Sequence, residues 1–276
     1  MENTLNSHLT PEQLLQPVLT IARDAALAIL EVYTSSFVIE HKDDASPLTA
    51  ADLAAHRIIC RDLAKLTPHL PILSEESASI PWPQRKTWDC YWLVDPLDGT
   101  REFIKRNGEF TVNIALIMNH QPVLGVVYVP TTDTGYYASR DTGAFRIIGR
   151  ASPLAISTRR TVADQIIVAG SRSHGSEVQK QFFESLGPNT QTVIVGSSLK
   201  HCLVAEGSID IYPRFGPTSE WDTAAAQCIV ERAGGKVTDM QFRPLLYNTK
   251  ESLLNPDFLV IADRQFDWQT RLAKFI

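Results

Sequence analysis

The chain has 276 residues, of which 44% are hydrophobic and 21% charged. That length suffices for one large domain or for two halves that share a core, and this apolar content excludes intrinsic disorder. The 26 Lys and Arg residues against 31 Asp and Glu residues give a formal net charge of −5. An acidic balance argues against a protein that coats duplex DNA, because the phosphate backbone is bound by surplus cations. Binding of an anionic ligand would need a local positive charge, such as a metal ion or a few well-positioned Lys or Arg side chains.

Neither a membrane span nor an export signal is expected. The longest apolar runs, such as residues 114–118 and 123–129, are only as long as strands. The first residues lack the basic and apolar regions of a signal peptide. The cysteines are scattered without C-x-x-C spacing, which predicts reduced, buried thiols in a cytoplasmic protein. They are Cys60, Cys90, Cys202 and Cys228.

Helices are expected early in the first half of the chain, and strands after them. A first helix is predicted over residues 11–33, because Thr10 and Gln13 form a capping box and apolar residues then recur on one face. A second helix is expected after Thr49, which suits its N-cap. Helices grouped before hairpins are typical of an α+β arrangement. Strands are expected at residues 37–40, 71–74, 91–94, 111–118, 123–129, 136–138 and 144–148.

Strands and helices alternate in the second half, which predicts an α/β arrangement. The expected strands are residues 166–169, 193–195, 209–212, 236–238 and 259–262. The expected helices are residues 177–186, 197–205, 221–233 and 266–275. We therefore expect an N-terminal α+β half over residues 1–155 and a C-terminal α/β half over residues 156–276.

The segment from Asp95 to Thr100, Asp-Pro-Leu-Asp-Gly-Thr, is the most informative in the chain. A buried strand leads to Asp95, Pro96 turns the chain, and Asp98 follows after one further residue. The two carboxylates and the carbonyl of Leu97 can therefore converge on one point. Oxygen ligands of this kind are those that Mg²⁺ prefers. Asp, Pro and Gly are also residues that favour turns, so this segment taken alone could equally be a purely structural turn.

Further carboxylates stand at strand ends and helix starts, where catalytic groups of α/β folds collect. Glu75 and Glu76 follow the strand predicted at residues 71–74. Asp52 lies in the first turn of the second predicted helix, and Asp222 near the start of a later one. Each also has a structural explanation, because Asp52 and Asp222 suit the first turn of a helix and Glu76 suits a solvated surface.

Two separated motifs, in this order, resemble the paired signature of the inositol monophosphatase superfamily. They are residues 95–100 and the stretch Trp221-Asp222-Thr-Ala-Ala, followed by Ala-Gly-Gly at 233–235. A finer resemblance, to the CysQ branch of 3′(2′),5′-bisphosphate nucleotidases, extends from about Leu14 to Leu259. It is carried by residues 46–52, 73–76, 106–117, 196–200 and 212–218. The resemblance implies the layered αβαβα fold of these sugar phosphatases.

The resemblance also implies the residues of an active site. Thr100 and Asp52 are implied as the catalytic pair that orients and deprotonates the attacking water. Two or three Mg²⁺ ions are implied, with Glu75 rather than Glu76 as a ligand. The implied metal ligands are Glu75, Asp95, the Leu97 carbonyl, Asp98 and Asp222. The implied substrate contacts are Glu75, Leu97, Asp98, Gly99, Thr100, Ser197, Lys200, Arg214, Asp222 and His174.

The activity that the resemblance implies is Mg²⁺-dependent, lithium-sensitive removal of the 3′-phosphate from adenosine 3′,5′-bisphosphate, which gives AMP and phosphate. The second implied substrate is 3′-phosphoadenylyl sulfate, and the implied role is to clear a by-product of sulfate assimilation. Lys200 and Arg214 suit the phosphate that does not react.

Two alternatives to this activity stay open, namely a sugar phosphatase like inositol monophosphatase and a non-catalytic nucleotide sensor. The expected partner is a small-molecule bisphosphate and no nucleic-acid polymer. The expected location is the cytoplasm, with peripheral association at the cytoplasmic face of the inner membrane as the alternative. The sequence does not indicate an oligomeric state.

Overall fold

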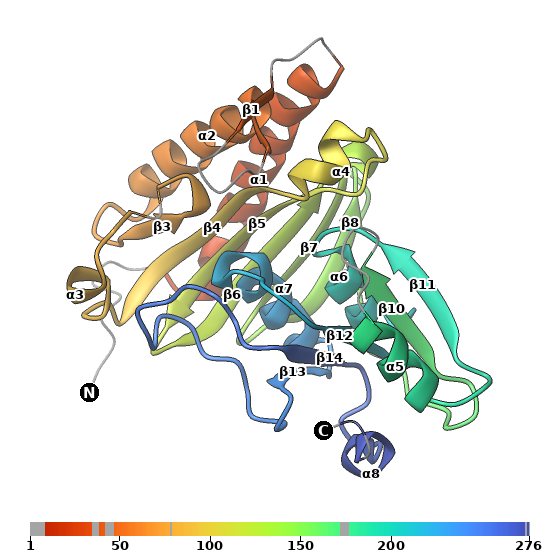
Figure 1. Ribbon diagram of the computed structural model, residues 1–276. Coiled ribbons are helices and arrows are strands. Elements are labelled where there is room, and N and C mark those ends of the chain that lie inside the picture. The colour runs from red at the N-terminus through yellow and green to blue at the C-terminus, as the bar shows by residue number, and fades with distance from the viewer. Residues whose placement is uncertain are drawn as a thin grey trace.

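Two large β-sheets alternate with layers of helices along the molecule (Figure 1). The computed structural model describes residues 9–34, 39–41, 47–77, 79–171, 177–273 and 275. A short antiparallel ladder joins β1 (Ile39–His41) and β2 (Pro47–Thr49) ahead of the second helix. Within the described part of the chain, no helix is both long and apolar enough to cross a bilayer.

The larger sheet has seven strands in the order β3-β4-β5-β6-β7-β8-β9. β3 runs parallel to β4, and every later pair of neighbours is antiparallel. Its central strands are buried along nearly their whole length, because helices cover both faces. The strands are β3 (Ile72–Ser74), β4 (Cys90–Asp98), β5 (Thr111–Met118), β6 (Gln121–Val129), β7 (Thr134–Ser139), β8 (Gly143–Ile148) and β9 (Leu154–Ala155).

Helices α1 (Pro11–Tyr33) and α2 (Ala50–Leu66) cover the outer face of this sheet (Figure 1). α1 begins where predicted, because the Thr10 hydroxyl accepts a hydrogen bond from the Gln13 N–H and the Gln13 side chain accepts one from the Thr10 N–H. The apolar stripe of α1 packs with that of α2 on the strands below. This outer core holds Asp52, on α2, completely buried.

The smaller sheet has five strands in the order β11-β10-β12-β14-β13. Its first three strands are parallel, and β14 is antiparallel to both of its neighbours. Helices α5 (Glu177–Ser185) and α8 (Trp268–Leu272) pack on its outer face through Phe182 and Trp268. The strands are β10 (Ile167–Ser171), β11 (Gln191–Val195), β12 (Ile211–Arg214), β13 (Lys236–Asp239) and β14 (Phe258–Ile261).

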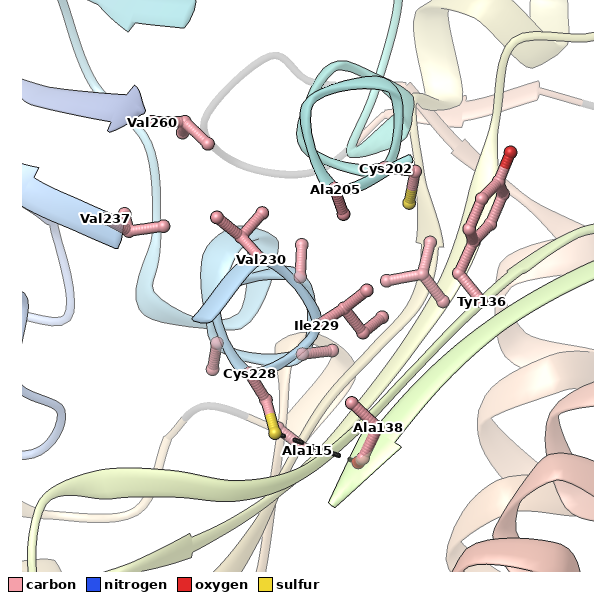
Figure 2. Packing of buried hydrophobic residues seen from close by; sticks show 14 of the residues in the cluster. Ala115, Tyr136, Ala138, Cys202, Ala205, Cys228, Ile229, Val230, Val237 and Val260 are labelled. Atoms are coloured by element: carbon pink, nitrogen blue, oxygen red, sulfur yellow. Dashed lines mark hydrogen bonds between the residues drawn. The ribbon is translucent and has the colours of Figure 1, made fainter. Parts of the chain in front are cut away.

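Helices α6 (Leu199–Ala205) and α7 (Glu220–Arg232) lie between the two sheets and share one core with both (Figure 2). Figure 2 shows Val230 of α7 directed at the smaller sheet and Cys228 directed at the larger one. The Cys228 thiol donates to the carbonyl oxygen of Ala138 on β7, at 3.7 Å. The expected layered αβαβα fold is thereby confirmed.

The predicted elements agree with the structure in type, and several agree to the residue. The first helix and the strand over residues 111–118 have their predicted bounds. β4 runs further than expected, to Asp98, and the last helix is shorter. Of the strand predicted at residues 37–40, residues 37 and 38 lie outside the described part, and β1 covers the rest. The short elements not predicted were η1 (Glu75–Ser77), α3 (Trp82–Arg85), α4 (Thr100–Ile104), η2 (Pro130–Thr132), β2 and β9.

The division at residues 155 and 156 stays a prediction. Strands before and after that point lie in different sheets. Yet α7, from the second half, packs against β4, β5, β6 and β7 of the first. All four cysteines are free, and three of them are buried, but Cys60 is only partly so.

The backbone of α7 approaches the larger sheet closely at Gly125 on β6. A Cβ atom built there would lie 2.1 Å from the carbonyl oxygen of Ala225 and 2.9 Å from the Cβ of Cys228. Only a residue without a side chain allows the helix backbone to approach the strand this closely. Gly125 therefore sets how deeply α7, and with it Asp222, lies against the sheet.

Replacing Gly125 by Ala should push α7 away from β6. We expect a loss of about 1–3 kcal/mol in the free energy of unfolding, as is usual for an overpacked core, together with weaker metal binding. Denaturant unfolding and a metal titration measure the two effects. Gly143→Ala is the control, since a Cβ there meets nothing within 4 Å and adds only the strain of a φ of +83°. Equal metal affinity in Gly125→Ala and the wild type would show that this contact does not position Asp222.

Candidate active site

The end of β4 brings two carboxylates to one place. The pairing of β4 with β5 is irregular between Asp95 and Asp98, so the strand bends there. The N–H of Leu97 donates to Oδ1 of Asp95 at 3.0 Å, which folds the turn back on the carboxylate. Gly99 then takes a φ of +94°, a backbone conformation that favours glycine, and α4 begins directly after it.

A third carboxylate joins these two from the middle layer. Asp222 stands in the first turn of α7, where its Oδ2 accepts the N–H of Ser219 at 2.8 Å in a capping box. One carboxylate oxygen from each of Asp95, Asp98 and Asp222 lies within 4.8 Å of the other two. We call these three residues the carboxylate cluster. Oxygen donors gathered in this way suit a hard divalent cation such as Mg²⁺.

The electrostatics of the carboxylate cluster favour a bound cation. Burial, followed by the charges of Glu75, Asp98, Asp222 and Asp52, raises the pKa of Asp95 well above its usual range. Burial, followed by the charges of Asp98 and Glu75, raises the pKa of Asp222 to about 8. No donor among the described residues reaches the buried Oδ2 of Asp95. These oxygen donors therefore fit a cation, which would balance the negative charge and contact Oδ2 of Asp95.

Glu75 and Glu76 act on different neighbours. The charge of Glu75 raises the pKa of Asp95 and that of Asp222, so Glu75 faces the carboxylate cluster. The charge of Glu76 acts instead on His56 of α2. This difference supports Glu75 as the expected ligand, although it stands outside the group of three that share the 4.8 Å limit.

The expected catalytic pair flanks the cluster from two helices. Thr100 is the first residue of α4, and its hydroxyl donates to the Leu97 carbonyl at 3.4 Å. Asp52 is buried on α2 and close enough to raise the pKa of Asp95. Whether Thr100 and Asp52 act together on a water stays a prediction.

A turn from the second half, residues 196–198, closes on Asp98. The hydroxyls of Ser197 and Ser198 donate to Oδ2 of Asp98 at 2.7 and 2.8 Å, and the N–H of Ser198 donates to the same oxygen at 2.7 Å. Ser197 has a φ of +53°, an uncommon backbone conformation for serine. We call residues 196–198 the serine turn.

Lys200 and Arg214 lie beside this turn in a pocket of about 260 Å³. The Lys200 ammonium is buried and donates to the carbonyl oxygens of Ser197, at 2.6 Å, and Val195, at 3.3 Å. Burial lowers the pKa of Lys200 to about 8, against the opposing effect of Asp98. Arg214 donates through Nε to Thr218 and through Nη2 to the carbonyl of Pro217.

The pocket and the carboxylate cluster are continuous. The walls of the pocket include residues of both, so the structure brings together the cations and part of the metal-ligand set. Of the expected site residues, the pocket walls contain Asp98, Gly99, Thr100, Ser197, Lys200, Arg214 and Asp222. Asp52, Glu75, Asp95 and Leu97 do not line the pocket, and His174 lies outside the described residues.

Several polar residues of the site were not found from the sequence. Thr111 and Asn113 are buried on β5 beside Asp95 and Asp98, and they contact the serine turn. The sequence feature that could have revealed them is a pair of polar side chains at alternate positions of an otherwise apolar strand. Side chains at alternate positions of a strand share one face.

Two further residues were also missed. Glu109 accepts the N–H of Gly196 at 2.7 Å and so ties the serine turn to the first half. His201 lies in the pocket wall, where its ring contacts those of Tyr212 and Phe258. Burial, assisted by the nearby positive charges of Lys200 and Arg214, lowers the pKa of His201 to about 3, so its imidazole is neutral.

Comparison with known proteins assigns the chain to a family. The sequence profile of the inositol monophosphatase family matches residues 10–273. The chain belongs to the inositol monophosphatase family. Members of this family depend on metal ions, which agrees with the carboxylate cluster.

Within the inositol monophosphatase family, the similar proteins include several named CysQ. The 3′(2′),5′-bisphosphate nucleotidase CysQ of Salmonella typhimurium is 49% identical over 249 residues, which cover 90% of this chain and 99% of that protein. Its namesake from Haemophilus influenzae is 38% identical and covers 97% of each chain. The crystal structure of CysQ from Bacteroides thetaiotaomicron is 41% identical, with a TM-score of 0.80 over 91% of this chain and 97% of that one. The expected resemblance to the CysQ branch is confirmed.

Replacing Asp222 by Asn tests the repulsion within the carboxylate cluster. Because folding raises the pKa of Asp222 from 3.8 to about 8, its contribution to stability without metal is present below about pH 4 and is lost as the pH rises through about 8. We expect the free energy of unfolding of the metal-free wild type to fall as the pH rises over this range. The free energy of unfolding of Asp222→Asn should fall by less. At about pH 8 the variant should melt at least about 2 °C higher, although it binds metal poorly.

Thermal unfolding in the presence of a chelator measures this effect. Asn keeps an oxygen that can accept the Ser219 N–H, so the helix cap is retained. Asp141→Asn, at an exposed turn, is the control and should follow the wild-type pH profile. Parallel pH profiles for Asp222→Asn and the wild type would contradict the proposed repulsion.

Proposed function

We propose that this protein is a Mg²⁺-dependent phosphomonoesterase that removes the 3′-phosphate of adenosine 3′,5′-bisphosphate, giving AMP and inorganic phosphate. The observation that carries the proposal is a carboxylate cluster at the edge of a pocket that is also lined by Lys200 and Arg214. A molecule with two phosphates suits a site that combines a metal-binding cluster with two further cations. The names of the relatives, which are 3′(2′),5′-bisphosphate nucleotidases, support the same substrate class.

The metal ligands of this proposal are the carboxylates of Glu75, Asp95, Asp98 and Asp222 and the carbonyl of Leu97. Bound there, two or three Mg²⁺ ions would supply an activated water and charge stabilisation for the leaving oxygen. The cluster supports this assignment, because burial and neighbouring carboxylates raise the pKa values of Asp95 and Asp222 and one buried oxygen of Asp95 has no described donor.

The protein's own groups position the water and the reacting phosphate. The Thr100 hydroxyl stands next to the Leu97 carbonyl, where it can orient a water, and a carboxylate such as Asp52 can take up the proton. The amides of Gly99 and Thr100 are the proposed donors to the reacting phosphate. Ser197, held on Asp98, adds a hydroxyl to the pocket wall.

The second phosphate would be held by Lys200 and Arg214, with His174 as a further proposed contact. The ammonium of Lys200 has an N–H donor beyond the two carbonyls that it contacts, and the guanidinium of Arg214 likewise has donors beyond Thr218 and Pro217. Charged hydrogen bonds of this kind are suited to phosphate. By the same logic 3′-phosphoadenylyl sulfate is a second substrate, because its 5′ group is also anionic.

The two rival functions make different demands on the site. An inositol monophosphate has no second phosphate for Lys200 and Arg214. A nucleotide sensor would need neither Thr100 nor Asp52 next to the carboxylate cluster. We further propose that the protein acts in the cytoplasm, in sulfate assimilation, and that lithium inhibits it, as the resemblance implies.

A phosphate-release assay on adenosine 3′,5′-bisphosphate, inositol 1-phosphate and fructose 1,6-bisphosphate tests the proposal. The wild type should release phosphate fastest from the first, and only with Mg²⁺. Asp98→Ala should lose at least about a hundredfold in kcat while it still binds the nucleotide. Faster release from inositol 1-phosphate would favour a sugar phosphatase, and no release from any substrate would favour a sensor.

Replacing Arg214 by Ala tests the site of the second phosphate. We expect KM for adenosine 3′,5′-bisphosphate to rise by about tenfold to a hundredfold, the equivalent of one charged hydrogen bond. KM for adenosine 3′-monophosphate should change by less than about threefold, because that substrate lacks the 5′-phosphate. Arg160→Ala, at an exposed position, is the matched control. Equal changes for both substrates would place the second phosphate elsewhere.

A further inference from the structure

Ser198 stands where the three segments that build the site meet. It is 2% exposed and occupies the N-cap position of α6. A serine at this position usually accepts a hydrogen bond from the backbone of its own helix. Here no such bond is made, and the hydroxyl faces the carboxylate cluster instead. The side chain is therefore used for something other than capping.

The hydroxyl of Ser198 reaches two members of the carboxylate cluster. It lies 2.8 Å from Oδ2 of Asp98 and 2.7 Å from the backbone carbonyl oxygen of Asp222. Since a hydroxyl has a single hydrogen, it donates to one of these acceptors at a time. Both acceptors are nevertheless held at hydrogen-bond distance from the same atom, and the N–H of Ser198 adds a second bond to Asp98.

Ser198 is itself fixed by the larger sheet. The side-chain amide of Asn113 donates to the Ser198 hydroxyl at 3.0 Å, and the Thr111 hydroxyl donates to the carbonyl oxygen of that amide at 2.9 Å. Thr111 and Asn113 are buried on β5, directly opposite Asp98 and Asp95 in the ladder. The position of the hydroxyl is thus set by a strand next to the one that carries the carboxylates.

We infer that Ser198 is a positioning residue that sets the distance between Asp98 and Asp222. Asp98 comes from the end of β4 and Asp222 from the start of α7, so they belong to segments far apart in the sequence. The Ser198 hydroxyl is a contact common to the side chain of the first and the backbone of the second. This inference rests on the proposed metal-ligand roles of Asp98 and Asp222.

The consequence is a specific effect on metal affinity. Replacing a residue that orients a metal ligand typically weakens metal binding tenfold to a hundredfold. Without the hydroxyl, the carboxylate of Asp98 keeps the donors from Ser197 and from the Ser198 N–H. The backbone of Asp222 loses its contact with the serine turn. The ligands would remain, but their mutual distance would no longer be fixed.

Direct titration of the metal-free protein with Mn²⁺, followed by the electron paramagnetic resonance of the free ion, tests the inference. Ser198→Ala should bind Mn²⁺ about tenfold to a hundredfold more weakly than the wild type. Ser198→Thr keeps the hydroxyl and should be closer to the wild type than Ser198→Ala is. Ser198→Cys keeps the volume with a weak donor and should resemble Ser198→Ala, which separates the hydrogen bond from the effect of a cavity.

Two further measurements keep the result unambiguous. Circular dichroism and thermal unfolding establish that each variant is folded, and Ser208→Ala, on an exposed turn, should bind Mn²⁺ like the wild type. Wild-type Mn²⁺ affinity in folded Ser198→Ala would overturn the inference. This titration needs no substrate, so the two claims can fail separately. Wild-type Mn²⁺ affinity in Ser198→Ala contradicts the role of Ser198 even if the wild type releases phosphate. Absence of phosphate release by the wild type contradicts the proposed function even if Ser198→Ala binds Mn²⁺ weakly.

Discussion

The crowding of buried carboxylates at the end of β4 is the constraint on which the rest of the structure depends. Asp95, Asp98 and Asp222 lie close together, and burial, followed by the charges of neighbouring carboxylates, raises the pKa values of Asp95 and Asp222. Such groups would move apart if their supports were soft. The rigid supports are the bent end of β4, the close packing of α7 at Gly125, and a serine turn that donates to Asp98. Packing of the hydrophobic cores thus holds in place an arrangement that electrostatics opposes.

Much of the fold could be predicted from the sequence, because its signals are local. The capping box at Thr10 and the apolar run over residues 111–118 mark element bounds without reference to the rest of the chain. The short helix α4 was not predicted. It begins after Gly99 in a left-handed conformation, and a glycine at this place is equally typical of a turn without a helix. The order of strands within each sheet was not predicted either, because it depends on packing between distant segments.

The candidate site was predictable where a motif carries several of its residues. Asp95, Asp98 and Thr100 belong to one segment, and Asp222 to a second, so the resemblance was enough to name them. The sequence could not show that Lys200 would be buried and donate to two backbone carbonyls, since a lysine near a helix start is usually solvated. It also could not reveal Ser198, because the hydroxyl contacts Asp98 and Asp222, which are distant in the sequence, instead of capping its own helix.

The location of α7 between the sheets also bears on how the molecule folds. Asp98 and Asp222 are separated by nearly half of the chain, so bringing them together closes a long loop and depends on contacts of high sequence separation. A chain in which only the larger sheet has formed would present Asp95 and Asp98 but lack the third carboxylate. If the proposed metal ligands hold, tight metal binding would need the fully assembled molecule, and metal bound only to this state would stabilise it against partial unfolding by mass action.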